Sequence, residues 1–176
     1  MSEILTFTGK MFDPIHPDPT LIDIRDIAHA LTFLCRANGH FRIFHSVAQH
    51  SLECCAEAKA RGCSKKIQLA CLLHDGSEAY LSDVTRPVKA VIPVYLEYEA
   101  PLQQAIWDKW LEKLTEEEYR TVFQIDDELL YHEFFTHTGM RLGEKEPKLL
   151  SEPTFAFEEF PKVEQSFLDA FYELTK

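Results

Sequence analysis

The sequence predicts an all-α protein, a bundle of five to six helices preceded by a small N-terminal β-hairpin. Two observations carry this prediction. Apolar residues recur at intervals of three and four over most of the chain, while strand-like alternation is confined to its first dozen residues. With 176 residues, 45% of them hydrophobic, the chain is long enough for one domain with its own core and short for two. We therefore treat residues 1–176 as a single domain.

The N-terminal elements follow from local patterns. Residues 4–14 alternate apolar and polar positions around Gly9, which predicts the hairpin. The proline-rich segment 13–20 then predicts a loop that leads into a helix. The first helix is expected near 23–36, because its apolar residues have helical spacing, and Asn38-Gly39 should stop it.

Two helices that carry histidines come next. The second, near 46–61, has Val47, His50, Cys54 and Ala58 on one stripe, and Gly62 ends it. The third is expected near 65–80, with Ser64 as its N-cap. Its stripe consists of Ile67, Ala70, Cys71, His74 and Glu78.

The remaining helices have clear start and stop signals. The fourth, near 93–112, contains the aromatic set Tyr95, Tyr98, Trp107 and Trp110. Thr115 and Glu118 form a predicted capping box for a fifth helix that runs to about residue 137. After Gly139 an irregular segment with two prolines precedes a last helix near 162–175.

Composition limits the location and the partners. The net charge of −11 argues against binding a nucleic-acid polymer, since phosphate contacts need a basic surface. The N-terminus lacks the features of a signal peptide, and no stretch has the roughly 18 apolar residues of a membrane span. We expect a cytoplasmic protein without a membrane partner. The five cysteines lack CxxC spacing and are expected to be reduced thiols among apolar neighbours.

Three apolar stripes contain an ionisable residue in line with the face that should be buried: His50, His74 and Asp126. A buried carboxylate is costly unless it is paired or bound to a cation, so inward ionisable groups on separate helices suggest a shared partner. Asp75, next to His74, can reach the same ion. Taken singly, a core histidine or an ion-paired aspartate is the ordinary explanation. Together, two imidazoles and two carboxylates suit a divalent metal.

Three segments resemble the H…HD…D signature of the HD phosphohydrolase superfamily: VAQHS at 47–51, LLHDGSEAYLSDVTRPVK at 72–89 and IDDELLYHE at 125–133. The resemblance is closer to the branch that includes bacterial 5′-deoxyribonucleotidases. It covers roughly residues 22–135 and fades over 138–176, which we regard as a C-terminal extension with a final helix. An HD-domain helical bundle is therefore the expected architecture.

The resemblance implies that His50, His74, Asp75 and Asp126 hold one divalent ion, which would be Mn, Co, Fe, Mg, Ni or Zn. Asp127 is the alternative for the last position, but it sits off the apolar stripe. The resemblance also implies catalytic carboxylates in two further positions. These are Glu78, expected to assist proton transfer, and Asp83, expected to orient substrate or water; a surface or loop carboxylate is the alternative for both.

Substrate contacts are less clearly marked. Arg36 precedes His50 at nearly the interval of the branch's phosphate-binding arginine, and a guanidinium suits a phosphate monoester. A solvated arginine at a helix end is the competing interpretation. Lys89 is the second expected substrate contact. Further positive charge near the site would come from His40, Arg42 and Arg86, each of which is otherwise a surface residue. Ala37 stands where the branch often has an aromatic residue, which leaves base and sugar recognition open.

The resemblance implies an enzyme that hydrolyses (deoxy)nucleoside 5′-monophosphates, small-molecule substrates, to nucleoside and phosphate. One alternative is a triphosphohydrolase, or another nucleotide hydrolase, with the same metal site. Another is a metal- or nucleotide-binding regulator without catalysis. A homo-oligomer, such as a homodimer, is also expected from the superfamily; Trp107 and Trp110 in the fourth helix would supply its interface or simply belong to the core.

Overall fold

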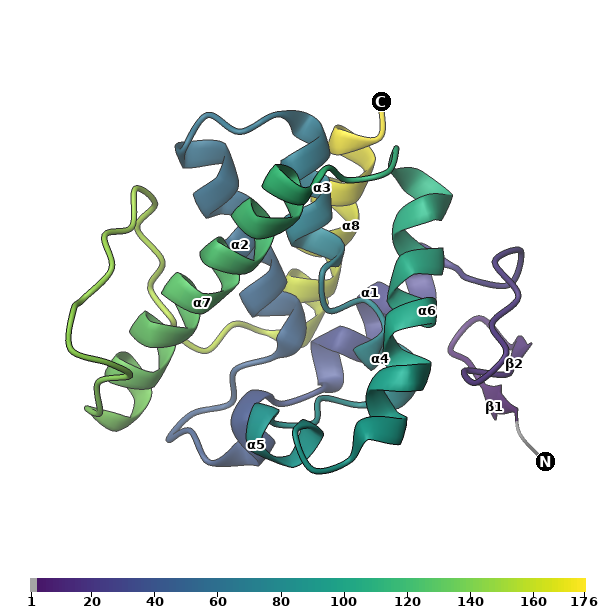
Figure 1. Ribbon diagram of the computed structural model, residues 1–176, viewed down its shortest axis with the longest axis horizontal. Helices are drawn as coiled ribbons and strands as arrows, with labels where there is room; N and C mark the ends of the chain where they lie inside the picture. Colours follow the sequence, from purple (N-terminus) through teal and green to yellow (C-terminus); the bar gives the residue numbers. More distant parts are fainter. Residues whose placement is uncertain (1–2) are drawn as a thin grey trace.

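The computed structural model describes residues 3–176 and confirms the all-α class (Figure 1). Its long helices form a bundle, with a two-stranded hairpin at one side. The long helices are α1 Ile24–Phe33, α2 Val47–Ala60, α3 Lys65–Leu73, α6 Pro93–Trp110, α7 Glu116–Thr138 and α8 Phe160–Leu174. Shorter elements are the 3₁₀ helix η1 Arg36–Gly39 and the one-turn helices α4 Glu78–Leu81 and α5 Arg86–Lys89.

The predicted hairpin is present. Strands β1 Ile4–Leu5 and β2 Met11–Phe12 pair antiparallel, with Ile4 opposite Phe12. Gly9 in the connection has φ +82°, a value that glycine adopts without steric cost. The hairpin is fastened to the bundle by Phe12, which is fully buried and lies 4.3 Å from the Tyr80 ring.

The predicted helix over 65–80 is wrong in its second half. α3 ends at Leu73, the chain turns after His74, and α4 begins at Glu78. The Gln103 side chain stabilises this break, because its Nε2 donates to Leu73 O at 2.8 Å and its Oε1 accepts from Ser77 N at 3.0 Å. A Cβ on Gly76 would lie 3.2 Å from Ile106, so the turn packs tightly on α6. The break is a tertiary effect that periodicity along one segment does not reveal.

Two other boundaries differ from prediction. The first helix ends at Phe33 rather than near 36, because Leu34 and Cys35 are extended and Cys35 forms an antiparallel bridge with Ser46. Ala37 and Asn38 then adopt positive φ of 52° and 50° in η1. α5 was not predicted. The predicted caps are confirmed, with Ser64 at α3 and a capping box between Thr115 and Glu118 at α7.

The C-terminal helix belongs to the main core. Val163, Phe167 and Phe171 of α8 are buried and pack with residues of α1, α2 and α3. Trp107 is buried, and Trp110 packs edge-on against Phe171 at 5.1 Å, so the core alternative for these tryptophans is confirmed. The homo-oligomer stays a prediction.

Among residues 3–176, every helix is too short or too polar to cross a lipid bilayer. All five cysteines are free thiols, with Cys54, Cys55 and Cys71 buried.

Candidate metal centre

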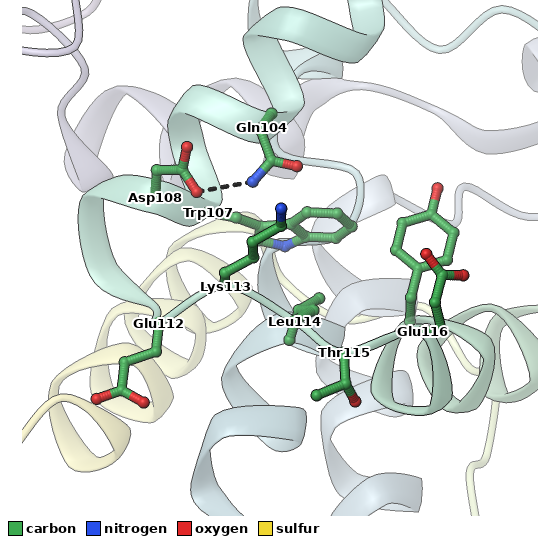
Figure 2. A pocket seen from close by; sticks show the side chains of 9 residues that line it. Gln104, Trp107, Asp108, Glu112, Lys113, Leu114, Thr115 and Glu116 are labelled. Carbon is green, nitrogen blue, oxygen red and sulfur yellow. Dashed lines mark hydrogen bonds between the residues drawn. The ribbon is translucent and has the colours of Figure 1, made fainter.

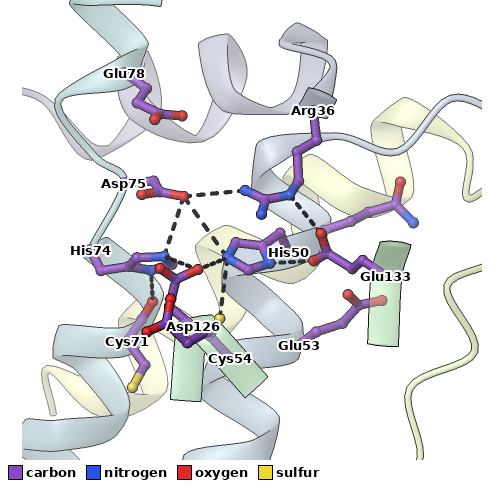
Figure 3. Close-up of polar contacts among 12 residues, drawn as sticks. Arg36, His50, Glu53, Cys54, Cys71, His74, Asp75, Glu78, Asp126 and Glu133 are labelled. Carbon is purple, nitrogen blue, oxygen red and sulfur yellow. Dashed lines mark hydrogen bonds and ion pairs between the residues drawn. The ribbon is translucent and has the colours of Figure 1, made fainter. Parts of the chain in front are cut away.

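The fold brings together all four predicted ligands, which come from three separate segments (Figure 3). His50 projects from α2, His74 and Asp75 follow the end of α3, and Asp126 lies on α7. His50 Nε2 lies 3.0 Å from Asp126 Oδ1 and 4.0 Å from Asp75 Oδ2. His74 Nε2 lies 3.2 Å from Asp75 Oδ2 and 3.7 Å from Asp126 Oδ1. Two imidazole nitrogens and two carboxylates thus converge on one small volume.

The orientation of the His74 ring suits metal binding. Its Nδ1 lies 2.7 Å from the carbonyl oxygen of Cys71, which can only accept, so Nδ1 carries the hydrogen. The opposite nitrogen, Nε2, is buried and has no hydrogen-bond partner in the described structure. Nε2 is therefore the nitrogen that faces Asp75 and Asp126, and it can bind an ion once its proton is displaced.

His50 is backed by Glu133, a residue to which the sequence assigned no role. Glu133 is fully buried in α7; its Oε1 contacts His50 Nδ1, and its Oε2 accepts from Arg36 Nε at 2.9 Å. A carboxylate on Nδ1 holds the hydrogen there and leaves Nε2 free for an ion. The signal was available, because Glu133 follows Asp126 by seven residues and so shares its helix face.

A cysteine adds a softer donor to the centre. Cys54 was expected to be only a small buried hydrophobe, and it is buried, but its Sγ lies 3.4 Å from His50 Nε2. Around a tetrahedral ion with nitrogen about 2.0 Å and sulfur about 2.3 Å away, these atoms would be about 3.5 Å apart. His50, Cys54 and His74 therefore form a group that can hold a metal ion.

The ionisation of the cluster reflects an excess of buried negative charge. Burial disfavours the charged form of His74, but Asp75 and Asp126 outweigh it and raise the pKa of His74 well above its usual value. The pKa of Asp75 is lowered to about 2, chiefly by His74 acting against burial. The carboxylates thus attract protons onto the imidazoles, and a bound cation would replace those protons.

The centre opens into a cavity of about 700 Å³. Asp75 and Asp126 reach its wall, together with all the predicted catalytic and substrate-binding residues: Arg36, Glu78, Asp83 and Lys89. Phe41, Phe123, Phe134, Leu130 and Leu142 line it as well. The cavity therefore combines a charged floor with an aromatic and aliphatic wall. His40 and Arg42 are exposed and do not line it.

Glu78 is not a surface carboxylate. It is 5% exposed, its Oε1 lies 3.4 Å from Lys89 Nζ, and its Oε2 is buried without a partner in the described structure. Burial, followed by the charges of Asp75 and Asp83, raises the pKa of Glu78 well above its usual value. Asp83 is half-buried, and burial likewise raises its pKa.

Arg36 is not a solvated helix end. It is 8% exposed and pairs with Glu133 and, at 3.5 Å, with Asp75. Arg36 thus links the carboxylate behind His50 to a predicted metal ligand, while it still borders the cavity. Because of these two pairs, the guanidinium has fewer N–H groups free to bind a substrate phosphate.

The structure separates Asp126 from its neighbour. Asp127 is exposed and contacts Arg86 Nη1, whereas Asp126 is buried and faces both histidines. Arg86 also donates to Asp126 Oδ2 at 2.8 Å. The sequence left Arg86 as a surface residue; it is exposed, but it also lines the cavity next to the centre.

A second, smaller cavity of about 190 Å³ lies between the end of α6 and the start of α7 (Figure 2). Trp107 and Tyr119 line it, and Gln104 Nε2 donates to Asp108 Oδ1 at 2.7 Å beside it. None of the predicted site residues borders this cavity.

Comparison with known proteins gives relatives without a stated function. No family profile matches the chain. It is 37% identical over 112 residues to the uncharacterized protein YfdR of Escherichia coli (strain K12), covering 62% of this chain and 59% of that protein. It is 41% identical over 105 residues to the uncharacterized protein RCAP_rcc00048 of Rhodobacter capsulatus, covering 56% and 53%. The chain thus matches somewhat over half the length of each relative.

The fold and the centre together define a helical protein with a buried cluster that can bind a metal ion. This arrangement is compatible with an HD-type domain. No family profile matches the chain, and the names of the two relatives state no function, so the comparisons do not narrow this class further.

Proposed function

We propose that the chain is a divalent-metal-dependent phosphohydrolase of the HD type, acting on (deoxy)nucleoside 5′-monophosphates. The observation that carries the proposal is the convergence of His50, His74, Asp75 and Asp126 at the floor of a cavity that also contains the buried Glu78. An acid or base beside a metal site within one cavity is what hydrolysis of a phosphate ester needs.

When bound, a divalent ion would polarise a phosphoryl oxygen and offset the negative charge on the oxygens of the transferred phosphoryl group. His50, His74, Asp75 and Asp126 would hold it, with Glu133 orienting His50 and the Cys71 carbonyl orienting His74. The fit rests on the orphaned Nε2 of His74 and on the mixed nitrogen and oxygen donor set.

Glu78 suits the role of general acid. Because its pKa is raised, it stays protonated where an ordinary glutamate is ionised, and it can donate that proton to the leaving oxygen. Lys89 lies 3.4 Å from it and adds positive charge for a phosphate. The water that attacks phosphorus would be oriented by Asp83, on the same cavity wall.

Arg36, Arg86 and Lys89 line the cavity beside its carboxylates, and together with a bound divalent ion they would offset that negative charge for an anionic substrate. Arg86 is the most exposed of these cations, with 59% of its side chain exposed, although it pairs with Asp126 and Asp127; Arg36 is buried in its pair with Glu133. Phe41, Phe123 and Phe134 offer apolar surface on which a base or sugar can pack.

Phosphate release tests the proposal. The purified protein is incubated with deoxy- and ribonucleoside mono- and triphosphates and with Mn²⁺, Co²⁺ or Mg²⁺, next to the Asp75→Ala and Glu78→Ala variants. We expect orthophosphate from monophosphates, dependent on added metal and lost in both variants. Release of tripolyphosphate from a triphosphate would change the proposed substrate to a nucleoside triphosphate and would still support the metal site. No turnover by a protein that still binds metal would overturn the enzyme in favour of a regulator.

A further inference from the structure

A second group of ionisable side chains lies behind His50, on the side away from His74. It consists of His45, just before α2, Glu53 of α2 and Glu133 of α7. Figure 3 shows Glu53 and Glu133 on that side of His50. His45 Nε2 lies 3.4 Å from Glu53 Oε2 and 3.7 Å from Glu133 Oε1. One donor atom from each residue falls within 4.8 Å of the others.

These distances do not fit direct hydrogen bonds. The His45 side chain has no exposed surface, yet neither of its ring nitrogens has a hydrogen-bond partner in the described structure, and Glu53 Oε2 has none either. Charge-assisted N–H···O bonds are normally about 2.7–2.9 Å long. Buried polar atoms that stay unpaired are costly and rare, so several orphans facing one another require an explanation.

A bound cation explains the two that face each other, His45 Nε2 and Glu53 Oε2. Around a tetrahedral ion with nitrogen and oxygen ligands about 2.0–2.1 Å away, neighbouring ligand atoms are about 3.3 Å apart, near the spacing of His45 Nε2 and Glu53 Oε2. We propose that His45, Glu53 and Glu133 form a second divalent-cation site, suited to zinc or a similar borderline ion. This site goes beyond the proposed function and does not depend on it.

Two features nearby are consistent with such a site. His137, one turn after Glu133 on α7, has a buried Nε2 without a partner, and its ring lies 5.2 Å from that of His45, so a fourth donor is close. Although burial opposes it, Glu133 and Glu53 raise the pKa of His45 to about 9. The two carboxylates therefore stabilise a positive charge at His45, which either a proton or a metal ion can supply.

Glu133 connects the two sites. Its Oε1 contacts His50 Nδ1 and also lies toward His45, and a carboxylate oxygen has two lone pairs with which to do both. The second ion would have a structural role, because it would tie the segment before α2 to α2 and α7. It would also fix the carboxylate that orients His50.

Counting bound zinc tests the inference. Protein freed of metal with a chelator is given excess Zn²⁺, desalted and analysed by elemental mass spectrometry. We expect two ions per chain in the wild type, one in Glu53→Gln, one in Asp126→Asn and none in the double variant. Glu128→Gln is the matched control on α7, since within residues 3–176 Glu128 pairs only with Arg61 and Gln124, and it should keep two ions.

One ion in the wild type that Glu53→Gln leaves unchanged would overturn the second site and identify His45 as a protonated ion-pair partner. Loss of both ions in Asp126→Asn would overturn it too. Circular dichroism checks that each variant is folded, and His45→Gln provides a second variant if Glu53→Gln is not. Because the readout is a metal count, lack of phosphatase activity would refute the proposed function and leave this test intact.

Discussion

His50 Nε2 lies 3.0 Å from Asp126 Oδ1, so the first histidine of the centre on α2 faces the last carboxylate on α7. Neither side chain could be buried alone without cost. Their pairing holds α2 and α7 together beside the position that a bound ion would occupy.

The adjacent aspartates of α7 should behave differently. Asp126→Asn removes a carboxylate that faces both histidines. We therefore expect it to abolish tight binding of the ion held by His50, His74 and Asp75 and to lower kcat at least about 100-fold. Asp127→Asn is the control, because Asp127 is exposed and pairs only with Arg86 in the described structure. Metal analysis and phosphate release measure both; equal effects would contradict the assignment of Asp126.

Glu133→Gln should weaken both metal binding and stability. Loss of a carboxylate behind a ligand histidine typically costs about 10–100-fold in metal affinity. It also removes the closer of the two partners of the buried Arg36 guanidinium and leaves only Asp75, at 3.5 Å, among the described residues, for which we expect up to about 3–5 kcal/mol of destabilisation in urea unfolding of the metal-free protein. Glu128→Gln, which breaks a partly exposed pair with Arg61, should cost less than about 1 kcal/mol. A Glu133→Gln variant as stable as the wild type would refute the role of this ion pair.

Glu78→Gln should reduce kcat about 10²–10⁴-fold and leave the metal content unchanged. As a general acid, Glu78 must be protonated, so wild-type activity should fall as the pH rises through its raised pKa. The variant should lose this alkaline limb of the pH–rate profile. Glu97→Gln, on the exposed surface of α6, should retain the wild-type profile. A variant that keeps the limb would exclude Glu78 as its source.

Cys54→Ala should change the choice of metal. Burial, then Asp126, raises the pKa of this thiol well above its usual value, so binding of a thiophilic ion must displace its proton. The Zn²⁺ affinity of the wild type should therefore increase with pH more steeply than that of the variant, and the variant should bind Zn²⁺ at least about tenfold more weakly relative to Mn²⁺. Cys55→Ala, at the neighbouring buried thiol, should leave this preference unchanged. Equal selectivity in both variants would exclude the sulfur as a ligand.

The hydrogen bonds from residues 150–151 to Glu57 should make the free energy of unfolding fall at acid pH. Burial would raise its pKa, but hydrogen bonds from the Ser151 hydroxyl and from the Leu150 and Ser151 amides outweigh burial and lower it to about 2. A lowered pKa stabilises the fold above the ordinary glutamate value, near pH 4.5, and this stabilisation is lost as the pH falls toward 2. Urea unfolding should show a smaller loss between pH 5 and pH 3 in Glu57→Gln than in the wild type. The same pH dependence in both proteins would contradict this role.

The sequence by itself determined the helical class, the hairpin, most helix boundaries and four residues that meet at the centre. Periodicity and capping are local properties, and His50, His74 and Asp126 stand out because each interrupts an apolar stripe. Only the tertiary structure decided the break after α3, since it depends on Gln103, 30 residues beyond Leu73 along the chain. It also decided the partners of Arg36 and the cluster of His45, Glu53 and Glu133. These contacts join α2 to α7 or to the segments that flank them, and such pairings arise only when helices far apart in sequence pack together.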